Sequence, residues 1–259
     1  MADFSAAPVK RMPRGMFREM TRNTFAITWK ELKAYFTQPM AYVVAVVFIA
    51  ITGFFFVDSL SGPLPLANLY GYLREIRWVL LVLVMGAVLT MRSIAEEQKL
   101  GTLELLLTSP VRDWEIVIGK YAATLIFFYS LLFLTLFYPL LLRIFASPDM
   151  GPIWTGYLGI ALAGAMFLAI GILASSLTNN QIVAAVLTLG ILFGLWFLYL
   201  AEGFIGGLPG SVFVYISPRS HYDSLVRGIL DTSAIIYFIT VTISALFVAA
   251  RSLESRRWR

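Results

Sequence analysis

Six long apolar runs dominate the sequence and restrict the chain to folds that use lipid as their solvent. A helix that crosses a bilayer needs about 20 mainly apolar residues. Hydrophobic residues make up 59% of this chain and charged residues only 14%, whereas soluble domains carry roughly a quarter charged residues. The sequence therefore predicts an all-α membrane protein with six transmembrane helices. The predicted spans are residues 40–58, 77–93, 117–142, 153–177, 181–201 and 233–250.

The basic residues are distributed unevenly between the two sides that six spans create. An even number of spans places both termini on one side. With the termini inside, 15 of the 20 Lys and Arg residues lie in inner segments, and inner loops of membrane proteins are enriched in these residues. We therefore expect cytoplasmic N- and C-termini. The net charge of +5 fits this face, and no basic arm interleaved with aromatics points to nucleic acid.

The segment before the first span has the pattern of an amphipathic helix. Phe25, Trp29, Leu32 and Phe36 recur at helical spacing over residues 20–37, with basic residues beside this stripe. Such a helix lies in the membrane interface against lipid, although a juxtamembrane helix that merely anchors the first span would look similar. The remaining divisions are a disordered N-terminus (1–19), a six-span domain (38–250) and a basic cytoplasmic tail (251–259).

Two connections between spans differ sharply in length. Residues 178–181 form a tight inner turn, so the fourth and fifth spans are expected to pack as antiparallel neighbours. The connection 202–232 is long, half apolar and interrupted by Gly and Pro. Ser217 followed by Pro218 is typical of a helix start. We expect two short re-entrant helices on the outer side here, packed on the bundle because irregular backbone is not tolerated in lipid.

Catalytic and metal-binding patterns are missing from the sequence. It has no cysteine and one histidine, and the Gly119–Lys120 pair is not followed by the Ser or Thr of a phosphate-binding loop. We expect no catalytic, cofactor-binding or metal-ligating residue. His221 is expected on the surface of an outer helix, and an intramembrane hydrolase that uses it stays an alternative. Four ionisable residues near span ends are expected to reach the interface. These are Asp58, Lys120, Arg143 and Glu202.

The inner connection "EEQKLGTLELLLTSPVRDWE" (96–115) is too charged for a span and too apolar for a solvated loop. Read as a helix from about residue 99 to Pro110, it separates an apolar face from an acidic one. The apolar face is Leu100, Leu103, Leu106 and Leu107, and the other is Glu97, Gly101, Glu104 and Thr108. An apolar helix face of this kind docks in a partner's groove. Rest on the membrane surface is the alternative, but anionic leaflets attract Lys and Arg rather than Glu.

This connection resembles the cytoplasmic loop of ABC-2-type ABC transporter permeases. The matching residues are Glu97, Gly101, Thr102, Glu104, Leu106, Leu107 and Pro110. The segments "ITWKELKAYFTQPMAYVV" and "YISPRSHYDSLVRGILD" are similar to the gliding-motility-associated permease subgroup.

The resemblance implies a permease subunit that couples ATP hydrolysis in a separate ABC-type ATPase to substrate export across the bacterial inner membrane. ATP and Mg²⁺ would bind the ATPase, and this chain would hold no cofactor. Residues 97–110 would be the coupling helix: the four leucines seat in the ATPase, Glu97 and Glu104 pair with its basic rim, and Gly101 permits close approach. A second permease, identical or paralogous, and an accessory envelope protein are further expected partners. A membrane scaffold that recruits a cytoplasmic ATPase without transport stays the alternative.

Overall fold

The computed structural model of the chain describes residues 14–60, 73, 76–102, 111–145 and 148–257. Within these ranges the chain forms helices joined by short connections, with no strand. Six helical segments are long and apolar enough to cross a membrane, which confirms the predicted spans. They are Ala41–Leu60, Ile76–Lys99, Asp113–Ile144, Met150–Leu177, Gln181–Ile205 and Thr232–Ser255.

The described helices run in the following order along the chain. They are α1 (Arg14–Thr37), α2 (Pro39–Leu60), α4 (Ile76–Thr90), α5 (Ala95–Lys99), α7 (Asp113–Thr135), α8 (Phe137–Phe145), α9 (Met150–Leu177), α10 (Gln181–Phe197), the 3₁₀ turn η1 (Leu198–Leu200), α11 (Ala201–Ile205), α12 (Gly207–Ile216), α13 (Pro218–Val226) and α14 (Thr232–Arg257). Helix α1 begins before residue 20, so residues 14–19, predicted to be disordered, are helical.

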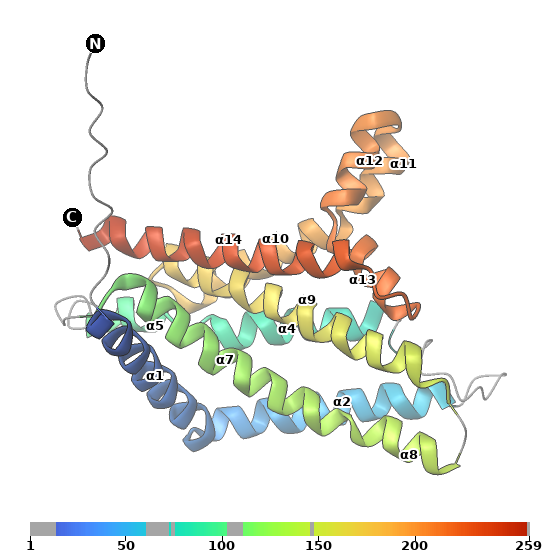
Figure 1. The fold of residues 1–259 in the computed structure, drawn as a ribbon, viewed down its shortest axis with the longest axis horizontal. Helices are drawn as coiled ribbons and strands as arrows, with labels where there is room; N and C mark the ends of the chain where they lie inside the picture. The colour runs from blue at the N-terminus through green and yellow to red at the C-terminus, as the bar shows by residue number, and fades with distance from the viewer. Residues whose placement is uncertain (1–13, 61–72, 74–75, 103–110, 146–147, 258–259) are drawn as a thin grey trace.

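Helix α9 forms the centre of the bundle, where it contacts α4, α7, α10, α13 and α14 (Figure 1). Its small residues permit this, because a Cβ at Gly164 would overlap the Phe128 ring and one at Gly171 would overlap the Thr90 side chain. Small residues at helix contacts let backbones approach closely in lipid. The close approach of α9 to α4 and α7 therefore depends on these two glycines.

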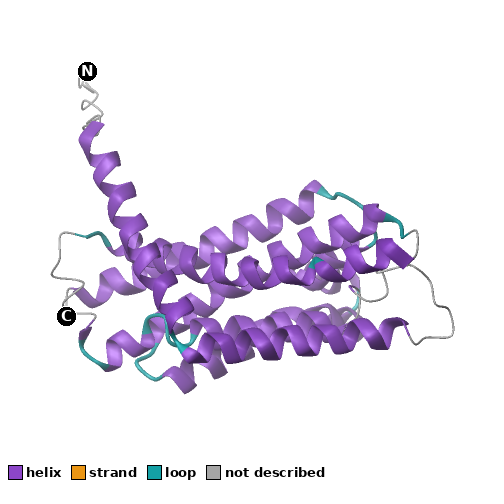
Figure 2. Ribbon diagram, turned by 90° about the horizontal axis from the view of Figure 1, so that it is seen from below, coloured by secondary structure: helices purple, strands orange, loops and turns teal. Residues whose placement is uncertain are grey.

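The bundle has two distinct ends. Helix α5, the N-terminal half of α1 and the C-terminus of the chain lie at one end, and α8 and α13 lie at the other (Figure 1). We call these the α5 end and the α8 end. Helix α1 leaves the bundle at a steep angle to the spans (Figure 2). The α5 end therefore carries α5 and the N-terminal half of α1, which belong to the two segments to which the sequence assigned roles outside the lipid.

The third span, predicted over 117–142 and formed by Asp113–Ile144, is interrupted at one residue. Helix α7 ends at Thr135 and α8 begins at Phe137. Pro139 explains the break, because proline has no N–H for the carbonyl four residues earlier and its ring crowds that carbonyl. The carbonyl left free is that of Thr135, and the Tyr157 hydroxyl of α9 donates to it at 2.9 Å.

The connection between α10 and α14 contains more helices than the two that the sequence predicted. Helix α11, which ends the fifth span, forms a hairpin with α12 that projects away from the other spans, and α13 packs on α9 (Figure 1). The break between α11 and α12 is at Gly206, whose φ of +62° suits glycine. The predicted helix start at Pro218 is confirmed, with Ser217 as the residue before it. Entry of the hairpin into the membrane stays a prediction.

Candidate functional site

Helix α5 is fixed to α9 by a serine hydroxyl. The first N–H groups of a helix have no partner within the helix, and here Ser175 Oγ accepts from Ile94 N at 3.1 Å and Ala95 N at 3.0 Å. One turn further on, Gln98 Nε2 donates to the Ser176 carbonyl at 3.1 Å. The C-terminal end of α9 thus caps α5 and holds its orientation.

An apolar cluster supports the same attachment. Ile94 is buried together with Val117 of α7, Ile172 of α9 and Leu253 of α14. Burying a side chain of this size contributes about 1.5–3 kcal/mol. The turn that leads into α5 is therefore packed against three helices that belong to transmembrane spans.

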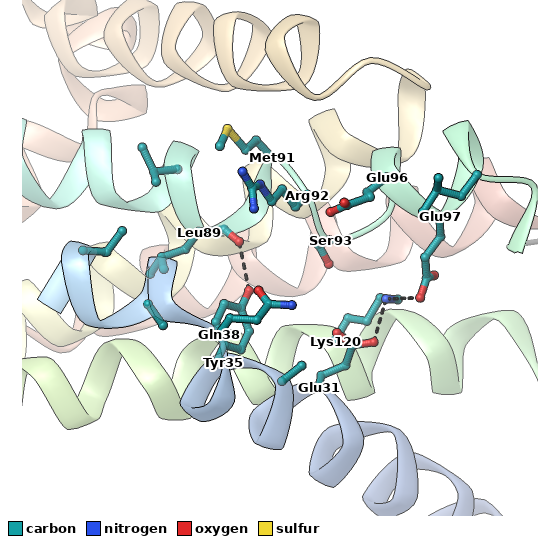
Figure 3. Close-up of a pocket in the computed structure, with 15 residues that line it drawn as sticks. Glu31, Tyr35, Gln38, Leu89, Met91, Arg92, Ser93, Glu96, Glu97 and Lys120 are labelled. Carbon is teal, nitrogen blue, oxygen red and sulfur yellow. Dashed lines mark hydrogen bonds and ion pairs between the residues drawn. The ribbon is translucent and has the colours of Figure 1, made fainter.

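A buried lysine joins α5 to two further helices. Lys120 of α7 is 2% exposed, and its Nζ lies 2.9 Å from Glu31 Oε1 of α1 and 2.9 Å from Glu97 Oε1 of α5 (Figure 3). A charge removed from water is tolerated when it is paired. We call these three residues the Lys120 triad. The expectation that Lys120 reaches the interface from a span end was wrong, because its ammonium is enclosed between three helices.

Glu97 therefore has a different position from the one predicted. The sequence assigned it to a face that meets an ATPase, but its carboxylate is directed inward at Lys120 (Figure 3). Its second oxygen, Oε2, is buried and has no hydrogen-bond partner. Glu97 therefore forms an ion pair inside the bundle, and its contact with an ATPase stays a prediction.

The segment that the sequence predicted as a helix from about residue 99 to Pro110 contains a left-handed residue at Gly101. Helix α5 ends at Lys99, and Gly101 has φ of +69°, a left-handed conformation that ends a helix and suits glycine. The helix that contains Glu97 therefore ends before Gly101. Leu100 is 66% exposed at this end. Leu103, Glu104, Leu106, Leu107 and Pro110 lie outside the described residues, and their docking role stays a prediction.

Helix α1 packs on α7 along one face. A Cβ at Gly119 would lie 2.8 Å from Ile27 Cγ2, so the two helices meet closely there. The buried carboxylate of Glu115 accepts from Asn23 Nδ2 at 3.4 Å and from Arg112 N at 3.2 Å. Contacts of these kinds fix α1 on the third span beside the Lys120 triad.

The opposite face of α1 is the predicted aromatic stripe. Phe25 and Trp29 are exposed and their rings stack with centroids 6.4 Å apart, and Leu32 is half-buried. Phe36 is exposed in part, and its ring also contacts the edge of Phe127 of α7, with centroids 5.7 Å apart. An exposed apolar face opposite a packed one is what an amphipathic helix at a membrane surface needs. The position of α1 in the membrane interface stays a prediction.

A cavity of about 240 Å³ lies beside the triad, between α1, α2, α4 and α5 (Figure 3). Glu96, Glu97 and Arg92 line it from the α4–α5 segment, and Glu31 lines it from α1. Its charged lining is unusual for a bundle that is otherwise apolar. Sequence reasoning missed both the cavity and its Glu31–Lys120 pair, although a lysine within an apolar run signals a need for buried partners.

His221 is buried rather than on the surface, which corrects the expectation. Its ring stacks on Tyr237 with centroids 4.2 Å apart, and Nε2 lies 2.9 Å from the Tyr215 carbonyl. The hydroxyls of Ser217 and Ser224 donate to backbone carbonyls, so neither forms a dyad with the ring. Among the described residues, no three His, Asp or Glu side chains gather as metal ligands. The geometry at His221 is that of a packed aromatic core.

Comparison with known proteins identifies the family of the chain. The sequence model of a family described as "ABC-2 family transporter protein" matches residues 25–251. No curated protein matched the chain. The matched region includes five whole spans, α5 and nearly all of α14. Permeases of this family are generally non-catalytic and typically work with a separate ABC ATPase subunit. The chain therefore belongs to the ABC-2 family of transporter proteins and is a membrane-spanning permease subunit of an ABC transporter.

Proposed function

We propose that this permease exports its substrate across the cytoplasmic membrane and is driven by a separate ATPase that docks at the α5 end. The ATPase binds ATP and Mg²⁺, and a second permease, identical or paralogous, completes the path. Both termini are cytoplasmic in this proposal. Its relation to the gliding-motility subgroup remains a prediction from two short segments.

The distribution of charge supports this orientation. The exposed basic residues Arg92, Lys99, Arg112 and Arg251 lie at or next to the α5 end. Cytoplasmic segments of membrane proteins are enriched in Lys and Arg near the ends of spans. The α5 end is therefore the side where a soluble ATPase would be found.

The attachment of α5 is the observation that carries the proposal. Ser175 binds its N-terminus to α9, and Lys120 binds Glu97 to α7 and α1. A displacement applied to the segment after Gly101 would pass through α5 into the central helix, the third span and the amphipathic helix together. Coupling between sites travels through contacts of this kind when the element has two arrangements. A loosely attached loop would absorb the same displacement.

The test is co-purification of the ATPase with tagged permease. Leu100→Asp places a charge on the docking segment, and we expect about a tenfold or greater loss of bound ATPase, because an unpaired charge in an interface core is strongly unfavourable. Leu103→Asp with Leu107→Asp is expected to act in the same way. Leu230→Asp is the matched control, since Leu230 is also 66% exposed but lies in the α13–α14 connection.

The possible outcomes distinguish docking at the α5 end from its alternatives. Loss of ATPase in Leu100→Asp and retention in Leu230→Asp support docking at the α5 end. Full retention of an ATP-hydrolysing complex in all the α5-end variants, with normal membrane insertion, contradicts it. If the accessibility of the outer loops to a labelling reagent is the same with and without ATP, the result would indicate a static scaffold instead of a transporter.

A further inference from the structure

The cavity beside the Lys120 triad combines a charged half with an apolar half. Arg92, Glu96 and Glu97 line the first, and Ala41, Val44 and Val88 line the second. Val44 and Val88 belong to α2 and α4, so the apolar half continues along two transmembrane spans. A site with this division suits a molecule that has a polar head and an apolar chain.

The charges in the cavity are only partly neutralised by the protein. Lys120 is shared by Glu31 and Glu97, yet Glu97 Oε2 remains buried without a partner. Glu96 and Arg92 form no ion pair with another described side chain. The carboxylates of Glu96 and Glu97 and the guanidinium of Arg92 therefore face the cavity and are able to bind a ligand. A buried polar group without a partner is unfavourable, and a ligand that pairs with it would remove that penalty.

We propose that this cavity binds the headgroup of a phospholipid that carries a primary ammonium beside its phosphate. The ammonium donates to Glu96 and Glu97, the phosphate pairs with Arg92, and an acyl chain follows Val44 and Val88. A purely anionic headgroup would meet the carboxylates, and a purely cationic one would leave Arg92 unpaired. The volume of about 240 Å³ lies below the roughly 300–1,000 Å³ of sites that enclose whole drug-sized ligands, as expected for a site that holds the headgroup and only the first part of one acyl chain.

Native mass spectrometry of the full chain, released from nanodiscs, tests this assignment. The discs contain equal amounts of phosphatidylethanolamine and phosphatidylglycerol, and free phosphoethanolamine is a separate probe. We expect phosphatidylethanolamine to be retained preferentially, and Glu96→Gln or Arg92→Gln to weaken its retention about tenfold each, because each removes a charge-assisted hydrogen bond. Glu202→Gln and Arg143→Gln are matched controls, since both residues are exposed and lie outside the cavity.

Three results would overturn the proposal. The first is unchanged retention of phosphatidylethanolamine in both cavity variants. The second is an equal loss of phosphatidylglycerol from them, which would indicate general loss of lipid contact. The third is binding of free phosphoethanolamine as tight as that of the lipid, which would assign the cavity to a soluble ligand. The measurement needs no ATPase, so failure of the docking proposal leaves its result interpretable.

Discussion

Replacing Lys120 by Met tests the triad most directly. Methionine is unbranched like lysine, is one atom shorter and carries no charge. Glu31 and Glu97, whose oxygens both lie 2.9 Å from Nζ, would then face each other without a counter-charge. Removing one partner of a buried ion pair costs about 3–5 kcal/mol. Because the two carboxylates are 21% and 16% exposed, water screens part of the repulsion, and we expect a loss of ~3 kcal/mol in the free energy of unfolding.

The assay is unfolding of the purified permease by titration with SDS, followed by tryptophan fluorescence. Arg251→Met is the control, because its pair with Glu254 is exposed and such pairs contribute about 0–1 kcal/mol. The triple variant Lys120→Met, Glu31→Gln and Glu97→Gln should recover most of the loss, since it leaves no unpaired charge. A single variant within ~1 kcal/mol of wild type, or a triple variant no better than the single one, would refute the reasoning.

Two further predictions concern the neighbouring contacts. Ser175→Ala removes the acceptor of two α5 N–H groups, so we expect faster hydrogen exchange at Ile94 and Ala95 and a loss of about 1–3 kcal/mol. Ser252→Ala, which loses a single 3.4 Å bond, is the control, and equal exchange in both variants would contradict the capping role. Burial raises the pKa of Tyr35 to about 12, so its contribution to stability is complete below pH 10 and is lost as the pH rises toward 12. Tyr35→Phe should lack this decline in unfolding measurements between pH 9 and 12, and an unchanged decline would argue against it.

The spans could be predicted from the sequence because lipid imposes a simple requirement on each of them. About 20 apolar residues form a helix that satisfies its own backbone, and this holds whatever the helix packs against. The break between α7 and α8 was also available in principle from Pro139. Hydropathy could not predict which group binds the freed Thr135 carbonyl. That group is the Tyr157 hydroxyl, which the packing of α9 places opposite the carbonyl.

Glu97 illustrates why the candidate site was harder to predict. Helical spacing grouped it with Glu104, but this grouping assumes one unbroken helix, and the positive φ at Gly101 ends that helix. The same sequence contained the opposing signal, since Lys120 within an apolar run requires a carboxylate partner. Spacing could not choose the partners, because Glu31 lies 89 residues away and reaches Lys120 only through the packing of α1 on α7. A charged residue in an apolar run is thus better interpreted as one that needs a buried partner than as one that reaches the interface from a span end.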